Sequence, residues 1–194
     1  MSLENLVKYN IILASKSPRR QELLKELGVN FDVQIKEVEE TYPDHLKAEQ
    51  IALYLCELKA NAFKQDEIDD NTLLITADTI VWHNNKVLDK PTDYDDAVNI
   101  LKQLSGDKHE VITGVCLKTK QRTSSFYVST DVYFKELTEE EIAYYINNYK
   151  PYDKAGAYGI QEWIGYIGIS KIQGSYFNVM GLPTQRLYEE LEKF

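Results

Sequence analysis

The chain is predicted to be an α/β protein built around a mixed β-sheet. Along its 194 residues, apolar runs typical of strands alternate with segments whose apolar side chains recur at helical spacing. Two segments of alternating polarity, 111–117 and 126–132, are separated by a short polar turn, which indicates a long antiparallel pair. No internal repeat or linker divides the sequence, so we expect one domain over residues 1–194.

The N-terminal part begins with an apolar run that leads directly into a helix. Ser17 suits the N-cap of that helix, Pro18 its first position and Gly28 the position just after its end. Hydrophobic spacing predicts, in order, a strand at 11–14, a helix at 18–27, a strand at 31–35 and a helix at about 47–63.

The rest of the chain continues this alternation. An apolar run at 73–81, interrupted by Asp78 and Thr79, ends at a hairpin turn formed by Asn84 and Asn85. The later elements are a helix capped by Thr92 with Asp95, a helix with a Thr138–Glu141 capping box, a strand around 166–169 and a final helix from Pro183.

Composition and charge limit the partners that the protein can have. Hydrophobic residues make up 43% and charged residues 27%, as in a soluble globular domain, and no apolar stretch reaches the ~20 residues that span a bilayer. The net charge of −9 disfavours nonspecific binding to nucleic acid or to an anionic membrane. The N-terminus lacks the features of a signal peptide, so we expect a cytoplasmic protein.

Cysteine and histidine usage gives no sign of a zinc site. Cys56 and Cys116 form no CxxC pair and are expected to be reduced, buried hydrophobes. His45, His83 and His109 have no ligand spacing such as HExxH, and we expect each of them at the surface or in a turn.

The segment from Ser15 to Arg20 is the strongest candidate for a binding site. Arg19 and Arg20 fall in the first turn of the predicted helix, where the positive end of the helix dipole disfavours cations. A polyphosphate would favour this placement, because free N–H groups, a capping hydroxyl and two guanidinium groups would meet there. The alternative is two solvated arginines in an exposed first turn.

Acidic residues form the second candidate. Asp78 stands at the end of a buried strand, where a carboxylate must be hydrogen-bonded, paired or metal-bound, unless it belongs to a bulge or an Asx turn. Glu39 or Glu40, from an acidic stretch that is otherwise a solvated charge run, could join it in an oxygen site for Mg²⁺ or Mn²⁺. Lys90, before Pro91, could meet a phosphate as a point charge.

Two loops rich in small residues complete the candidate site. Gly156 and Gly159 allow the segment 152–161 either to approach a ligand or to pack closely, and Gln161 offers a donor and an acceptor for a base edge. The segment 174–178 is a second loop of this kind. The sequence has no GxxxxGK[ST], GxGxxG or GxSxG, so phosphoryl chemistry would depend on arginines, lysines, a metal and an activated water.

Together and in this order, these segments resemble the Maf family of nucleotide pyrophosphatases. The matching stretches extend over nearly the whole chain: LASKSPRR at 13–20, ADT at 77–79, KP at 90–91, TGV at 113–115, DKAGAYGIQ at 153–161 and GSYFNVMGLP at 174–183. The resemblance implies a two-lobed, mixed-sheet α/β fold of the Maf and ITPase kind around a deep central cleft. It also implies hydrolysis of a nucleoside triphosphate between its α and β phosphates, which gives the monophosphate and pyrophosphate.

The resemblance also implies a role for each candidate residue. Asp78 matches the catalytic base, and Glu40, or Glu39 in another alignment, matches the acidic residue that handles metal or water. A divalent cation, Mg²⁺ or Mn²⁺, would then be held by Glu40 and Asp78. The positions that match phosphate-binding residues are Ser15, Arg19, Arg20, Lys59 and Lys90.

Substrate choice is implied by three further matches. The branch of the family that acts on dTTP and UTP has Thr after the catalytic Asp and Gln after Gly-Ile, whereas the branch that prefers 7-methyl-GTP differs at both positions. Thr79 and Gln161 fit the first branch, with Arg19 as the third specificity position. We therefore predict a house-cleaning enzyme for dTTP, UTP and modified pyrimidine nucleotides.

Two other functions compete with this prediction. One is a non-catalytic, nucleotide-binding regulator of cell division that acts through protein partners, because the family is associated with arrest of septum formation. The other is a nucleic-acid binder, which the acidic net charge disfavours. Since members of the family often form dimers, a homodimer is also expected.

Overall fold

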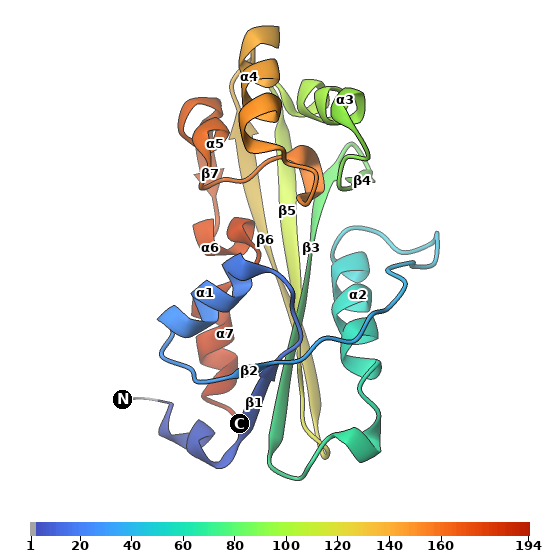
Figure 1. Cartoon of the computed structure of the whole chain (residues 1–194), viewed down its shortest axis with the longest axis vertical. Coiled ribbons are helices and arrows are strands. Elements are labelled where there is room, and N and C mark those ends of the chain that lie inside the picture. The colour runs from blue at the N-terminus through green and yellow to red at the C-terminus, as the bar shows by residue number, and fades with distance from the viewer. Residues whose placement is uncertain (1–2) are drawn as a thin grey trace.

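The computed structural model describes residues 3–194, which fold around a seven-stranded mixed sheet (Figure 1). The strands are β1 (Asn10–Leu13), β2 (Asp32–Val33), β3 (Thr72–His83), β4 (Lys86–Leu88), β5 (Lys108–Lys118), β6 (Thr123–Phe134) and β7 (Ile169–Gln173). They follow the order β2-β1-β3-β5-β6-β7, with β4 paired to β3 beside this path. β1 pairs in parallel with β2 and β3, and the other pairs are antiparallel, so the predicted mixed sheet is confirmed.

Helices pack on both faces of the sheet and at one end of its long strands (Figure 1). The α-helices are α1 (Pro18–Glu26), α2 (Glu49–Asn61), α3 (Tyr94–Leu104), α4 (Glu139–Tyr149), α5 (Trp163–Gly168), α6 (Tyr176–Met180) and α7 (Thr184–Leu191). Short 3-10 helices are η1 (Glu4–Lys8), η2 (Gln65–Glu67) and η3 (Ala155–Ala157). Within residues 3–194, no helix is both long enough and apolar enough to cross a membrane.

Alternate residues of β3 build cores on opposite faces of the sheet. Leu73 and Ile75 belong to the cluster that contains residues of α1 and α7. Leu74 instead packs with Cys56 and Ala60 of α2. Since successive strand side chains point to opposite faces and both faces are covered here, the strand appears in the sequence as a nearly continuous apolar run.

The long strands β3, β5 and β6 connect two lobes. In Figure 1 the helices α3, α4 and α5 surround the upper end of these strands, and α1, α2 and α7 surround the lower part. The upper lobe has its own core, to which Leu101 of α3 and Tyr145 of α4 contribute. The two-lobed fold expected from the family resemblance is therefore present, and residues between the lobes can face a cleft.

Most predicted helix boundaries are confirmed. The Ser17 hydroxyl accepts a hydrogen bond from Arg20 N, Gly28 follows α1 with a φ of 76°, and Thr138 and Glu141 form the predicted capping box. The cap of α3 differs, because Asp93 rather than Thr92 accepts from the backbone of Asp96. A carboxylate there also interacts favourably with the positive end of the helix.

Three short elements differ from the prediction. The expected strand at 166–169 is wrong, because Trp163–Gly168 is helix α5 and the strand follows as β7. A run this short cannot separate helix from strand by periodicity. The segment 174–178 is not only a loop, since helix α6 begins within it, and β2 is shorter than 31–35 because β1 ends at Leu13.

The two cysteines follow the prediction and two histidines do not. Cys56 and Cys116 are free and buried. His45 is exposed as expected, but His83 and His109 are buried. His83 Nε2 lies 2.9 Å from Asp107 Oδ2, and His109 Nε2 lies 2.7 Å from the Tyr158 hydroxyl, so each buried ring has a hydrogen-bond partner at Nε2. His109 Nδ1 has no such partner among the described residues.

Candidate active site

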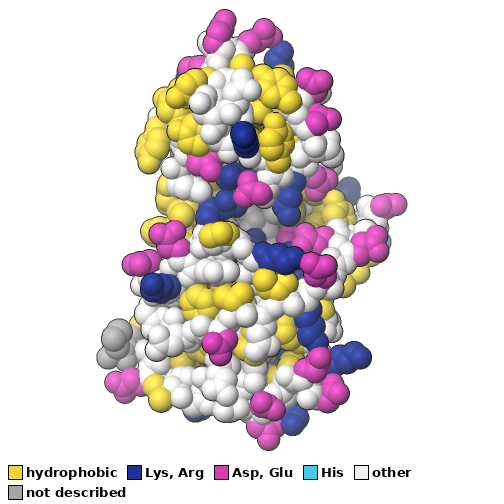
Figure 2. Space-filling view, in the orientation of Figure 1, with side chains coloured by type: hydrophobic (Ala, Val, Ile, Leu, Met, Phe, Trp, Pro, Cys, Tyr) yellow, Lys and Arg dark blue, Asp and Glu magenta, His cyan; other side chains and the backbone are white. Residues whose placement is uncertain are grey.

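The candidate site lies where one edge of β3 has no neighbouring strand among the described residues. β1 pairs with β3 only as far as Ile75, and β4 pairs with it only from Val81 onward. Between these points lies a cleft of two adjoining cavities, of about 360 and 460 Å³. Figure 2 shows the hollow at mid-height, with Lys, Arg, Asp and Glu side chains around it. On this open edge, residues that point to either face of the sheet can reach the cleft.

Asp78 lies in the middle of β3, so its predicted place at a strand end is wrong. It pairs in regular register with Gly114 of β5, which excludes the bulge and the turn. A Cβ atom on Gly114 would lie 2.4 Å from the Ala52 carbonyl oxygen, so a residue without a side chain lets α2 pack this closely on the sheet. This close packing brings Lys59 of α2 to Asp78.

Lys59 forms ion pairs with both acidic residues of the site. Its Nζ contacts Asp78 Oδ1 and lies 3.0 Å from Glu40 Oε1. The side chains of Lys59 and Asp78 are only 16% and 10% exposed, whereas that of Glu40 is 43% exposed. Burial alone would raise the pKa of Glu40, but the charge of Lys59 and of two further cations in the cleft lowers it. Glu40 is therefore ionised at neutral pH.

The two arginines at the start of α1 have different surroundings. Arg20 donates from Nε to the Gly181 carbonyl at 2.7 Å, from Nη1 to the Ala77 carbonyl at 2.9 Å and from Nη2 to Thr79 Oγ1 at 2.9 Å. It thus satisfies a carbonyl on the open edge of β3, and three of its five N–H groups are used within the protein. Burial lowers the pKa of Arg20, although a guanidinium remains charged. Arg19 lies 3.6 Å from Asp153 and is more available to a ligand.

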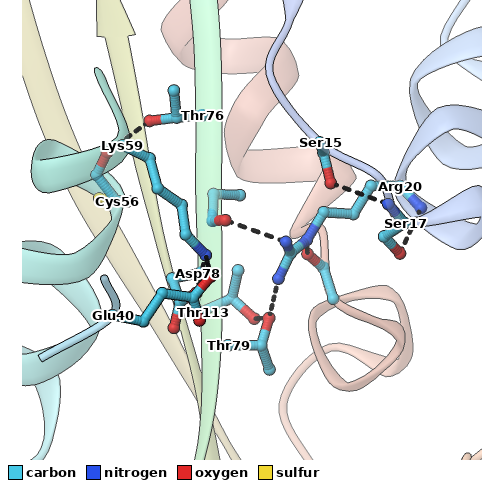
Figure 3. A network of polar contacts seen from close by, with 12 residues as sticks. Ser15, Ser17, Arg20, Glu40, Cys56, Lys59, Thr76, Asp78, Thr79 and Thr113 are labelled. Atoms are coloured by element: carbon cyan, nitrogen blue, oxygen red, sulfur yellow. Dashed lines mark hydrogen bonds and ion pairs between the residues drawn. The ribbon is translucent and has the colours of Figure 1, made fainter. Parts of the chain in front are cut away.

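Lys59 and Arg20 approach β3 from opposite sides (Figure 3). Lys59 extends from α2 toward Asp78, and Arg20 extends from α1 toward Thr79. Asp78 and Thr79 are consecutive in β3, so their side chains point to opposite faces of the sheet. The charged groups around Asp78 are therefore separated from the hydrogen-bonded groups around Thr79.

The loop after α4 supplies a residue to which the sequence analysis gave no role. Lys154 lines the cleft although it is 8% exposed, and its Nζ lies 2.8 Å from Asp153 Oδ1 and 3.1 Å from Glu162 Oε1. Its place within the DKAGAYGIQ stretch was the only signal that could have identified it.

Small residues of the same loop serve packing against the sheet. Gly156 has a φ of 69°, and a Cβ atom there would lie 2.8 Å from Val81 Cγ2 of β3. This agrees with the packing alternative rather than with ligand approach at that position. Gln161, at the end of the loop, is half-buried and is not among the residues that line the two cavities.

The cleft brings together nearly all the residues that the sequence predicts for the site. Glu40 lines both cavities, whereas Glu39 lines neither, which favours Glu40 as the acidic site residue. Apart from Gln161, every predicted site residue lines the cleft: Ser15, Arg19, Arg20, Glu40, Lys59, Asp78, Thr79 and Lys90.

The acidic pair has the chemistry to hold a divalent cation with a ligand's help. Since one ammonium group contacts both Asp78 and Glu40, the carboxylates lie close enough to share a cation. Within residues 3–194, no group of three or more His, Cys, Asp or Glu side chains could hold a metal by itself. Mg²⁺ is usually bound by one or two carboxylates together with water and substrate phosphates. A polyphosphate in the cleft could supply the oxygen ligands that the protein lacks.

Two sequence relatives resemble this chain over nearly its whole length, and a solved structure overlaps about two thirds of it. A dTTP/UTP pyrophosphatase of Flavobacterium johnsoniae is 55% identical over 191 residues, which are 98% of each chain. Another, of Phocaeicola vulgatus, is 59% identical over 192 residues, which are 98% of this chain and 99% of the relative. A HAM1 protein from Coxiella burnetii overlaps 65% of this chain and 73% of that one, with a TM-score of 0.45 and 15% identity.

The family assignment depends on the sequence relatives and on a match to the family as a whole. The family described as Maf-like protein matches residues 10–194, which include the cleft residues from α1 to α6. The chain belongs to the Maf family.

Proposed function

We propose that this protein hydrolyses nucleoside triphosphates between the α and β phosphates, with dTTP and UTP as preferred substrates. The observation that carries the proposal is the cluster of Glu40, Lys59 and Asp78 inside a cleft that also holds further cations. Relatives at 55% and 59% identity, each named dTTP/UTP pyrophosphatase, support it. The same activity would remove modified pyrimidine nucleotides from the nucleotide pool.

In the proposed reaction, Asp78 orients the attacking water and accepts its proton. Its position beside the Lys59 ammonium keeps the carboxylate in one orientation, as a general base requires. Attack at the α phosphorus transfers negative charge to the leaving pyrophosphate. Arg19 and Lys90, with the two remaining N–H groups of Arg20 and the hydroxyl of Ser15, would bind the phosphates and stabilise that charge.

We assign Glu40 and Asp78 as the protein's ligands for a Mg²⁺ or Mn²⁺ ion that is bound together with the triphosphate. Such a cation neutralises phosphate charge and polarises a phosphoryl oxygen. Thr79, Gln161 and Arg19 are assigned to base selection, on the match to the dTTP and UTP branch; of these, Thr79 and Arg19 line the cleft. A homodimer, a cytoplasmic location and the absence of nucleic-acid and membrane partners stay predictions.

The test is pyrophosphate release by the purified protein from dTTP, UTP, CTP, GTP, 7-methyl-GTP and ITP, with Mg²⁺ or Mn²⁺. We expect turnover that is fastest with dTTP and UTP. Preference for another base would retain the reaction and contradict the roles of Thr79 and Gln161. Tight nucleotide binding without any pyrophosphate release would contradict the proposal and favour the regulator of cell division.

A further inference from the structure

A chain of hydrogen bonds leads from α1 through β3 and β5 to α6. Arg20 Nη2 lies 2.9 Å from Thr79 Oγ1, which lies 2.9 Å from Thr113 Oγ1. Thr113 Oγ1 lies in turn 3.0 Å from the backbone carbonyl oxygen of Asn178. Thr79 and Thr113 are directly opposed in the β3–β5 pair, and Figure 3 shows their hydroxyl groups next to each other.

The chemistry of the two ends gives this chain one direction. A carbonyl oxygen only accepts, so the single hydrogen of the Thr113 hydroxyl is donated to Asn178. The reverse orientation would leave two oxygens 3.0 Å apart with no hydrogen between them. Thr113 must therefore accept from Thr79, and Thr79 in turn accepts from the guanidinium, which only donates.

The Thr79 hydroxyl is consequently left with one lone pair and no hydrogen for a ligand. Thr79 lines the cleft, whereas Thr113 is fully buried and cannot touch a ligand there. Gly181 also lines the cleft, and a Cβ atom there would lie 3.6 Å from Thr79 Oγ1. Because glycine lacks that atom, no side chain of residue 181 touches the Thr79 hydroxyl. A phosphate oxygen only accepts hydrogen bonds at this position, so Thr79 does not suit the triphosphate.

The far end of the chain is held firmly. Asn178 is fully buried, and its Nδ2 donates to the Val111 carbonyl and to Thr130 Oγ1, both at 2.9 Å. Its backbone carbonyl also accepts from Gly181 N at 3.0 Å. The acceptor that orients Thr113 therefore belongs to a buried, hydrogen-bonded part of the core between β5, β6 and α6.

We propose that Thr113 is a positioning residue that keeps the Thr79 hydroxyl an acceptor, so that the cleft selects a pyrimidine base whose ring N3 carries a hydrogen. Uracil and thymine have this N–H group, whereas N3 of cytosine is an acceptor and the N–H groups of cytosine lie on its exocyclic amine. The inference rests on the proposed function, because it assumes that the base of a pyrimidine triphosphate reaches Thr79. It explains selectivity by a residue that makes no contact with the substrate.

The first test compares Thr113→Val with Thr113→Ser, using the ratio of kcat/KM for UTP to that for CTP. These nucleotides share sugar and phosphates, so the ratio reports on the base alone. Valine removes the acceptor and leaves the Asn178 carbonyl its bond from Gly181 N, whereas serine keeps the hydroxyl. We expect the ratio to fall about tenfold in Thr113→Val, since one hydrogen bond changes direction, and to be retained in Thr113→Ser. An unchanged ratio in folded Thr113→Val would overturn the proposal.

The second test uses the unmodified protein and does not depend on the folding of a variant. N3-methyl-UTP lacks the N–H group, and 5-methyl-UTP carries the same added methyl elsewhere on the ring. We expect kcat/KM to be about 100-fold lower for the N3-methyl analogue, because the Thr79 hydroxyl would lose the N–H group from which it accepts and would meet a methyl group instead. Equal use of both analogues would overturn the inference about Thr113 and Thr79 and leave the proposed function standing. No turnover of UTP or dTTP would overturn the proposed function as well.

Discussion

Asp78 and Thr79 are neighbours in β3, yet they lie in different kinds of surroundings. Asp78 forms an ion pair with Lys59, beside Glu40, on the side of α2. Thr79 belongs to a directed chain of hydrogen bonds between Arg20 and Thr113, on the side of α1 and α6. Side chains alternate along a strand, so the two residues point to opposite faces of the sheet. The open edge of β3 exposes both of them to the same cleft.

This difference suggests a division of tasks between the two sides. Charged groups at the cleft can exchange partners with a cation or a water, so the α2 side suits activation of the attacking water. The hydrogen bonds from Arg20 through Thr79 and Thr113 to Asn178 have every partner inside the protein and hold a fixed geometry, so this chain suits structural support and selectivity. Substitutions on the two sides should therefore affect different measured quantities.

The largest expected effect is the loss of turnover in Asp78→Asn. We expect kcat for UTP to fall about 10³-fold, because the amide cannot accept the proton of the attacking water. The free energy of unfolding in urea should change little, since Lys59 keeps its ion pair with Glu40. Glu39→Gln, at an exposed position outside the cleft, is the control and should retain full activity. A kcat within about tenfold of the unmodified enzyme would contradict the role of Asp78.

A smaller effect, on stability, should separate the two arginines. Arg20→Ala removes the donor of the Ala77 and Gly181 carbonyls and of Thr79, so we expect the free energy of unfolding to fall by about 3 kcal/mol. Arg19→Ala removes a single ion pair and should change it by less than about 0.5 kcal/mol. Urea unfolding of both variants provides the measurement. Equal losses would show that the hydrogen-bonded side has no special structural role.

The smallest effect extends the comparison to the buried pair of His109 and Tyr158, of which Tyr158 lines the cleft. Burial, with the charge of His83, lowers the pKa of His109 from its ordinary 6.5 to about 3. Between these values the unfolded chain binds a proton that the folded protein does not, so stability falls as the pH falls. Between pH 7 and pH 5 we expect the unmodified protein to lose about 2 kcal/mol more than His109→Gln. Parallel urea-unfolding results at both pH values would contradict the buried neutral histidine.

Much of the fold could be predicted because local patterns and tertiary packing agree. The apolar alternation of β5 and β6, the capping box of Thr138 and the Ser17 cap all describe interactions between residues near in sequence. The failures lie where distant residues decide. The run at 166–169 became part of α5 and β7, and His83 and His109 became buried because Asp107 and Tyr158 were present to bond them.

At the candidate site, too, local patterns were predicted and contacts between distant residues were not. Motif order led to Asp78, Arg19, Arg20 and Lys90, and the structure places all of them at the cleft. It did not predict that Arg20 would be bonded mainly to the protein, or that Lys154 would line the cleft. Partner groups separated by many positions along the chain leave no periodic pattern in a single sequence.

The sequence by itself determined the order and type of most elements and the mixed sheet, because propensity, capping and alternation act over a few residues. It also singled out side chains that line the cleft. The tertiary structure alone decided which partner each side chain meets. Lys59 reaches Asp78 because Gly114 lets α2 pack closely on the sheet. The Thr79 hydroxyl has its direction because Thr113 lies opposite it across the strand pair and Asn178 lies behind Thr113. Such directions arise from contacts between distant segments, which exist only after the chain has folded.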